Sequence, residues 1–275
     1  MTDLTGKNAD ALSRKKLWLL DMDGTIYNEN QIFDGTLDFL ARIRQQGGRY
    51  VFITNNSSRS VADYVKKVNA MGIEAGFEDF YTSSQATAMY IKKNYPGQTV
   101  YCMGTRSLVE ELRQSGLKVV TQADASATVV LIGFDTENTS EKIRDTCIML
   151  GRDVAYLATN PDLVCPVSFG FIPDCGSMSI MLKNATGKEP FFIGKPQPIM
   201  VDCVLQNTGI SREEAVIVGD RLYTDIATGI NAGVDTICVL SGEASMQDIQ
   251  EWDKEPDWIF RDVRQIWKTL RKTAF

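Results

Sequence analysis

The sequence contains no histidine among its 275 residues. This absence excludes zinc sites built on histidine, Ser-His-Asp triads and phosphohistidine chemistry. If the protein is a catalyst, it must therefore use carboxylates, lysine, hydroxyl groups or a bound metal ion.

Basic residues are fewer than acidic ones, with 29 Lys and Arg against 35 Asp and Glu and a net charge of -6 at pH 7. Nucleic-acid polymers and membrane surfaces are bound by proteins with a basic field, so we expect neither as a partner. A phosphate group handled by this chain must instead meet a local cation.

Long apolar runs and paired cysteines are also missing. No apolar run reaches the length of a membrane span, and residues 1–16 lack the apolar core of a signal peptide. The six cysteines are scattered without a C-x-x-C pair, and several lie in apolar runs, which is typical of small buried residues in a reduced protein. These features predict a cytoplasmic location.

Short β-branched or aromatic runs alternate with helical patterns along the chain. Strands are expected at 17–22, 50–54, 191–194 and 215–219, and residues 60–71 carry their apolar side chains on one helical face. This alternation predicts an α/β fold, a mostly parallel sheet with helices on both faces. About 140 residues separate Thr54 from Lys195, too many for one crossover helix, so a second domain is expected between them.

Two aspartates, Asp21 and Asp23, directly follow the first apolar strand. Burying a carboxylate at the end of a strand costs free energy unless a cation lies beside it, so the pair predicts a metal ion or a basic side chain nearby. Met22 points the other way and Gly24 lets the backbone leave the sheet, so both carboxylates face the crevice where open α/β sheets bind ligands. A turn capped by an aspartate would look similar.

Polar side chains follow two further expected strands. Thr54, Asn55 and Asn56 precede a helix and could form a cradle for phosphate oxygens, although plain helix capping uses the same residue types. Lys195 follows the apolar run at 191–194 and is the obvious fixed cation for a phosphoryl group.

Asp220 and Asp225 follow the strand expected at 215–219. One of them can ligate a metal while the other orients water ligands or Lys195. Asp225 alone is equally typical of an acid at a helix N-terminus. All candidate ligands are hard oxygens, which favours Mg²⁺ over zinc.

Taken in order, these segments resemble the four motifs of the haloacid dehalogenase superfamily of phosphatases: Asp21-Met-Asp-Gly-Thr25, Thr54-Asn-Asn56, Gly194-Lys-Pro196 and Gly219-Asp220 followed by Asp225. The chain more closely resembles the NagD-like branch, subclass IIA of the p-nitrophenyl-phosphatase type, through Ala158-Thr-Asn-Pro-Asp162 and Val216–Ile226. The resemblance begins at about Leu17 and runs to the C-terminus.

The resemblance implies a doubly wound, Rossmann-like core formed by residues 1–83 and 188–275, with an inserted α/β cap of the C2 type at 84–187. In the cap, Asn160 and Asp162 would recognise the leaving group of the substrate. The Gly/Pro-rich stretch 168–177 would be a loop that overhangs the core. It also leaves open a homodimer formed through the cap.

The resemblance further implies a reaction through an aspartyl-phosphate. Asp21 would attack phosphorus, and Asp23 would protonate the leaving group and then activate water. Mg²⁺ would be held by Asp21, the Asp23 backbone carbonyl and Asp220. The phosphoryl oxygens would be bound by Thr54, Asn55, Asn56 and Lys195. Asp225 would orient water ligands or Lys195 without binding the substrate itself.

The substrate class is a small phosphorylated metabolite, namely a nucleotide 5′-monophosphate or a sugar phosphate, with p-nitrophenyl phosphate as a surrogate. Alternatives are a phosphotransferase or mutase on the same core, or a phosphatase for pyridoxal phosphate or phosphoglycolate. A response-regulator-like phosphoacceptor is disfavoured, because it would be a single domain of roughly half this length. The sequence does not choose among the substrates.

Overall fold

The computed structural model describes residues 1–167 and 169–271. The chain forms two compact units. We call Met1–Ile53, Val65–Tyr81 and Lys195–Phe275 the core unit, and Thr54–Tyr64 with Thr82–Gly194 the inserted unit. The functional cap at 84–187 and the core domain at 1–83 and 188–275 stay predictions. No helix in the described ranges is both long and apolar enough to span a bilayer.

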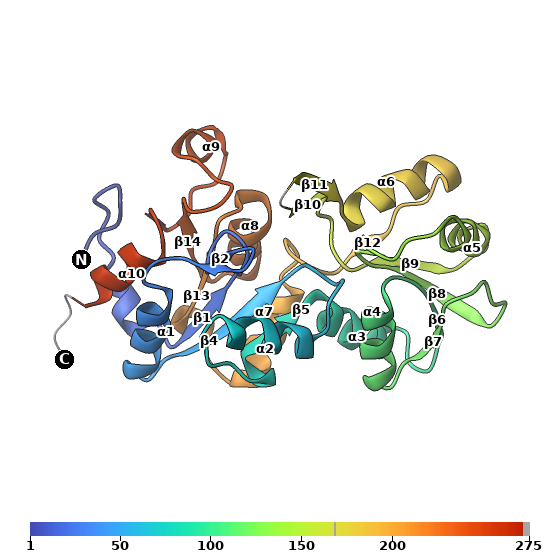
Figure 1. Ribbon diagram of the computed structural model, residues 1–275, viewed down its shortest axis with the longest axis horizontal. Coiled ribbons are helices and arrows are strands. Elements are labelled where there is room, and N and C mark those ends of the chain that lie inside the picture. The colour runs from blue at the N-terminus through green and yellow to red at the C-terminus, as the bar shows by residue number, and fades with distance from the viewer. Residues whose placement is uncertain (168, 272–275) are drawn as a thin grey trace. The chain divides into compact units, whose positions relative to one another are not determined.

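A mostly parallel sheet with the strand order β15-β14-β13-β1-β4-β5 lies at the centre of the core unit (Figure 1). β1 pairs in parallel with β4 and β13, and the pairings of β13 with β14 and of β14 with β15 are also parallel. The strands are β1 Leu17–Leu20, β4 Arg49–Thr54, β5 Phe80–Thr82, β13 Ala215–Gly219, β14 Asp235–Val239 and β15 Trp258–Phe260. Their residues are almost all buried, as expected for a sheet covered on both faces.

The strand order reverses between β1 and β13, because the chain continues from β1 to β4 on one side and reaches β13 on the other only later. The carboxyl ends of strands at such a reversal are where open α/β sheets bind ligands. The predicted α/β fold with a parallel sheet is confirmed. The strand order predicts a ligand site at the carboxyl ends of β1 and β13.

Helices and short elements complete the core unit. The helices are α1 Thr36–Gln45, α2 Val61–Ala70, α7 Ile199–Thr208, α8 Ala227–Ala232, α9 Met246–Glu251 and α10 Val263–Leu270, and a small hairpin joins β2 Tyr27–Asn28 to β3 Gln31–Ile32. The first residues of α2 belong to the inserted unit. Phe39 of α1 packs edge-on against Trp18 of β1, with ring centroids 5.4 Å apart.

The inserted unit has its own parallel sheet, with the order β12-β9-β8-β6-β7. The strands are β6 Thr99–Met103, β7 Lys118–Val120, β8 Ala127–Ile132, β9 Ala155–Ala158 and β12 Phe191–Phe192, and the helices are α3 Ser83–Asn94, α4 Arg106–Gln114, α5 Ser140–Leu150 and α6 Cys175–Thr186. Each helix starts after a residue whose side-chain oxygen accepts a backbone N–H, namely Thr82, Thr105, Thr139 and Asp174.

The stretch 168–177, expected to be a loop, instead contributes to a hairpin and a helix. β10 Val164–Val167 pairs antiparallel with β11 Gly170–Pro173, and α6 begins at Cys175. Exposed and half-buried residues alternate along both strands, which is the pattern of a hairpin with one covered face. Ser168, the first residue of the expected loop, lies outside the described residues.

Candidate active site

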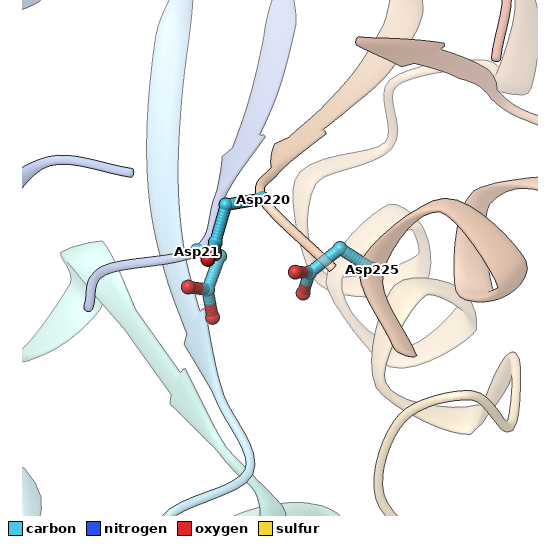
Figure 2. Close-up of side chains that lie close together, drawn as sticks. All are labelled: Asp21, Asp220 and Asp225. Atoms are coloured by element: carbon cyan, nitrogen blue, oxygen red, sulfur yellow. The ribbon is translucent and has the colours of Figure 1, made fainter. Parts of the chain in front are cut away.

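Three carboxylates gather at the edge of the core sheet where the strand order reverses. Asp21 follows β1 and Asp220 follows the neighbouring β13, so the parallel register brings them together. Asp225 lies on a π-helical turn, Leu222–Ile226, a type of turn that is frequent at functional sites. Figure 2 shows the three side chains close together, and one oxygen from each lies within 4.8 Å of the others.

Lys195 is the basic side chain at the centre of this group. Its Nζ donates to Asp21 Oδ1 at 2.6 Å and to Asp225 Oδ1 at 2.6 Å, and its side chain is 3% exposed. Burial alone would lower the lysine pKa, but the charges of Asp21 and Asp225 outweigh burial and raise it. Lys195 is therefore held as a cation between the two carboxylates.

Asp220 is fixed by main-chain and hydroxyl donors. Its Oδ2 accepts the Glu243 N–H at 2.8 Å, and its Oδ1 accepts the Thr25 hydroxyl at 3.3 Å. Gly24 has a φ of +86°, and a Cβ there would lie 2.4 Å from Asp220 Oδ2. Glycine is thus required at position 24 both by the backbone and by the close approach of the carboxylate.

Burial, followed by crowding of negative charge, raises the pKa of two of the aspartates. Burial and then the charge of Asp225 raise the pKa of Asp21 well above its usual range. Burial and Asp225 likewise raise the pKa of Asp220 to about 6. Asp225 is already engaged, since its Oδ1 accepts from Lys195 and its Oδ2 accepts the Arg221 N–H at 3.1 Å.

These observations fit a divalent cation bound by Asp21 and Asp220. The donor set consists of hard carboxylate oxygens, and a cation beside them would offset the repulsion that raises their pKa values. Asp225 fits a supporting role, because it holds Lys195 in an ion pair rather than binding the divalent cation itself. The residues present are therefore compatible with the metal centre expected from the sequence.

Asp23 stands apart from this cluster. Its side chain is 46% exposed, and its carboxylate meets the Tyr27 hydroxyl at 3.4 Å and Lys67 Nζ at 3.9 Å. The two aspartates of the first motif thus have different surroundings, one buried beside a lysine and one half exposed. Different surroundings are what separate roles require of two neighbouring carboxylates.

The remaining predicted residues lie in the inserted unit, where three of them form one buried network. Asn55 Nδ2 donates to Asp162 Oδ2 at 3.0 Å, and Asn160 Nδ2 donates to the Asn55 carbonyl at 2.7 Å. The Asp162 N–H in turn donates to Asn160 Oδ1 at 3.1 Å. Asn160 and Asp162 therefore hold the turn after β4, and their predicted role in specificity stays a prediction.

Local hydrogen bonds order the same turn from within. The Asn56 N–H donates to Thr54 Oγ1 at 3.2 Å, and Asn56 Oδ1 accepts from the backbone N–H and the hydroxyl of Ser58. Ser57 and Ser83, which were not predicted as site residues, also contribute hydrogen bonds to this turn. Ser57 Oγ pairs with Thr159 Oγ1 at 2.8 Å, and Ser83 Oγ donates to the Asn55 carbonyl at 2.7 Å. Only Ser57, within a run of polar residues after a strand, carried a signal in the sequence.

A cavity of about 460 Å³ lies within the inserted unit. This volume falls in the range of small-molecule sites. Its lining combines apolar and polar side chains: Phe134, Ile172, Pro173, Met178 and Met181 with Asp135, Thr136, Asn138 and Ser177. Its volume is sufficient for a small organic group.

Residues 18–118 match the family described as haloacid dehalogenase-like hydrolase, and residues 192–266 match the family described as HAD-hydrolase-like. The chain is similar to the acid sugar phosphatase of Staphylococcus saprophyticus, with 34% identity over 94% of this chain and 98% of the relative. It is also similar to the solved structure of a 4-nitrophenylphosphatase from Thermotoga maritima, with 35% identity and a TM-score of 0.90 over 95% of this chain and 100% of the other.

A further similar structure is NagD from E. coli K-12, with 31% identity and a TM-score of 0.84 over 91% of this chain and 98% of the other. The fold is shared over nearly the whole length of these solved structures. The chain therefore belongs to the haloacid dehalogenase-like hydrolases, in their NagD-like branch, and is a phosphatase.

Proposed function

We propose that this phosphatase is a Mg²⁺-dependent phosphomonoester hydrolase that works through an aspartyl-phosphate at Asp21. The observation that supports this most is the position of Asp21. It lies at the edge of the sheet where the strand order reverses, 2.6 Å from the buried Lys195 and beside Asp220. A carboxylate held next to a fixed cation in this way suits nucleophilic attack on a phosphoryl group.

Mg²⁺ would be held by the side chains of Asp21 and Asp220 and by the Asp23 backbone carbonyl. When bound, it would supply the positive charge that lets an anionic nucleophile approach an anionic phosphoryl group. Asp225 keeps Lys195 directed at Asp21, because its own carboxylate is fixed by the Arg221 N–H.

Two steps follow for the side chains of the chain itself. Asp21 attacks phosphorus, the bond from phosphorus to the leaving oxygen breaks, and Asp23 gives its proton to that oxygen. Asp23 then takes a proton from water, which displaces phosphate from Asp21 and restores the carboxylate. The half-exposed position of Asp23 supports this exchange of protons with a leaving group and with water.

We propose that Thr54, Asn55 and Asn56 bind the phosphoryl oxygens together with Lys195. The side-chain amides of Asn55 and Asn56 already take part in hydrogen bonds within the inserted unit. Asn55 would therefore contribute its main-chain N–H, whereas Asn56, whose main-chain N–H already donates to Thr54 Oγ1, would contribute its side-chain Nδ2, with the Thr54 hydroxyl as a further donor.

The substrate would be a small phosphorylated metabolite. Sugar phosphates come first, because a relative is named acid sugar phosphatase, and p-nitrophenyl phosphate is a fitting surrogate. Nucleotide 5′-monophosphates, pyridoxal phosphate and phosphoglycolate are the further candidates. We propose that the cavity of the inserted unit contributes to substrate choice, because its lining offers both apolar and polar contacts.

The test is a turnover screen of the purified protein against a panel of phosphomonoesters, with Mg²⁺ and after exhaustive chelation. We expect release of phosphate from at least one sugar phosphate and from p-nitrophenyl phosphate, loss of both activities with EDTA, and recovery with Mg²⁺. Undiminished turnover after chelation would contradict the metal dependence. Slow turnover in water with fast transfer to an added acceptor would indicate a phosphotransferase or mutase.

A further inference from the structure

The carboxylate of Asp23 is flanked by two side chains of the core unit. The Tyr27 hydroxyl donates to Asp23 Oδ2 at 3.4 Å, and Lys67 Nζ lies 3.9 Å from Asp23 Oδ1. Tyr27 also meets Asp23 through the backbone, since the two residues form an isolated bridge. Each oxygen of this carboxylate thus has its own described partner.

Lys67 is unusual among lysines on a helix surface because its side chain is only 16% exposed. Its Nζ lies 3.9 Å from the centroid of the Tyr27 ring, and Tyr27 itself is fully buried. A cation over an aromatic face is attracted to the ring, and more strongly when it is desolvated. The neighbouring Lys66 on the same helix is exposed. The ammonium of Lys67 is therefore held over the ring and directed toward Asp23.

A half-exposed aspartate would otherwise sample several rotamers. Proton transfer needs the donor within hydrogen-bond reach of the leaving oxygen, and a misplacement of about 1 Å can cost about 100-fold in rate. We infer that Lys67, acting with Tyr27, is a positioning residue that holds the Asp23 carboxylate where it can exchange protons with the leaving group and with water. This inference rests on the proposed role of Asp23.

The choice of leaving group separates this role from two others. A sugar phosphate expels an alkoxide, which needs a proton as it leaves, whereas 4-nitrophenolate leaves as a stable anion. Loss of positioning at Asp23 should therefore affect kcat/KM for the sugar phosphate far more than for p-nitrophenyl phosphate. A lysine that binds the phosphoryl group would affect both substrates through KM, and a lysine that only supports the fold would affect both equally.

The experiment compares Lys67→Met, Lys67→Arg and the matched control Lys66→Met on both substrates with Mg²⁺. We expect Lys67→Met to lower kcat/KM for the sugar phosphate at least about tenfold and for p-nitrophenyl phosphate less than about threefold. Lys67→Arg keeps the charge and should recover part of the loss. Lys66→Met should match the unmodified protein on both substrates.

Asp23→Asn, measured alongside, distinguishes failure of this inference from failure of the proposed function. If Asp23→Asn shows no preference for the aryl ester, the role of Asp23 is wrong. If Asp23→Asn shows the preference but Lys67→Met does not, or if Lys67→Met raises KM equally for both esters, the positioning role is overturned. Should Lys67→Met be unfolded in a thermal melt, Lys67→Gln and Lys67→Arg carry the same comparison.

Discussion

Lys195 is the residue on which the electrostatics of the core site depend. It forms ion pairs of 2.6 Å with both Asp21 and Asp225, and all three side chains are largely buried. Removing one partner from a buried pair leaves an uncompensated charge, which is strongly destabilising. The same ion pairs that fix Asp21 in the fold would therefore also orient the proposed nucleophile.

Asn160 has a comparable structural task in the inserted unit. Its side chain is fully buried and donates to the Asn55 carbonyl, while its Oδ1 accepts the Asp162 N–H. The predicted role of Asn160 and Asp162 in substrate choice and this structural task lead to different results when Asn160 is truncated.

We expect Asn160→Ala to lower the free energy of unfolding by about 1–3 kcal/mol, because two buried main-chain groups lose their partner. It should also lower kcat/KM by a similar factor for every substrate, since the turn at 54–56 loses its support. Chemical denaturation and assays on two esters measure both effects. The matched control is Asn94→Ala, which removes an exposed side-chain amide that donates a hydrogen bond to the Tyr90 carbonyl. A changed substrate ranking with unchanged stability would instead support the specificity role.

At the scale of elements, the polar residues after β1 and β13 could be predicted from the sequence, because an aspartate at the end of a buried parallel strand is costly unless it meets a cation. Lys67 could not be predicted. On an amphipathic helix a lysine beside a buried valine is ordinarily solvated, and only the fold places Tyr27 beneath it. The hydrogen bond from Asn160 to the Asn55 carbonyl could not be predicted either, because the two residues are 105 positions apart in the sequence.

Helix α4 carries a buried carboxylate, and we expect it to make the stability of the inserted unit depend on pH. In the described part of the chain, Glu111 Oε2 is buried without a hydrogen-bond donor. Burial and then the charge of Asp63 raise the pKa of Glu111 from 4.5 to about 7. The folded state thus binds this proton more tightly than the unfolded state does. The resulting stability is fully present below pH 4.5 and is lost as the pH rises through 7.

Glu111→Gln should remove this dependence. Relative to the unmodified protein, we expect the variant to gain about 1–3 kcal/mol in free energy of unfolding between pH 5 and pH 8. Denaturant unfolding at the two pH values measures the difference. Glu110→Gln changes an exposed neighbour on the same helix and should show no such gain. An equal response of both variants to pH would mean that the Glu111 carboxyl is solvated in the folded protein.

At the scale of the whole molecule, the proposed function assigns chemistry and substrate choice to different parts of the chain. The carboxylates and Lys195 belong to the core unit, whereas the cavity lies within the inserted unit. Alternation of strands and helices predicted the α/β class, and the stretch of about 140 residues between Thr54 and Lys195 predicted a second domain. The hairpin of β10 and β11 was not predicted, because its Gly and Pro residues are typical of loops and its strands are only partly covered.

Filling the cavity should change substrate ranking without changing the chemistry. Met181 on α6 lines the cavity, and we expect Met181→Trp to lower kcat/KM for the preferred sugar phosphate at least about tenfold while p-nitrophenyl phosphate loses less than about threefold. The neighbouring Ile180 is also exposed but does not line the cavity, so Ile180→Trp should leave the ranking unchanged. Equal losses on both esters for Met181→Trp would place substrate recognition elsewhere.

The most direct test of the proposed mechanism is to trap the phosphorylated enzyme. In Asp23→Asn, p-nitrophenyl phosphate should still phosphorylate Asp21, because its leaving group needs no proton, but water would no longer be activated. We predict a burst of about one equivalent of 4-nitrophenolate per active site. Borohydride reduction of the acyl phosphate should then place homoserine at position 21 in peptide mass spectra. A burst without modification of Asp21, or reduction at another carboxylate, would contradict the assignment of Asp21 as the nucleophile.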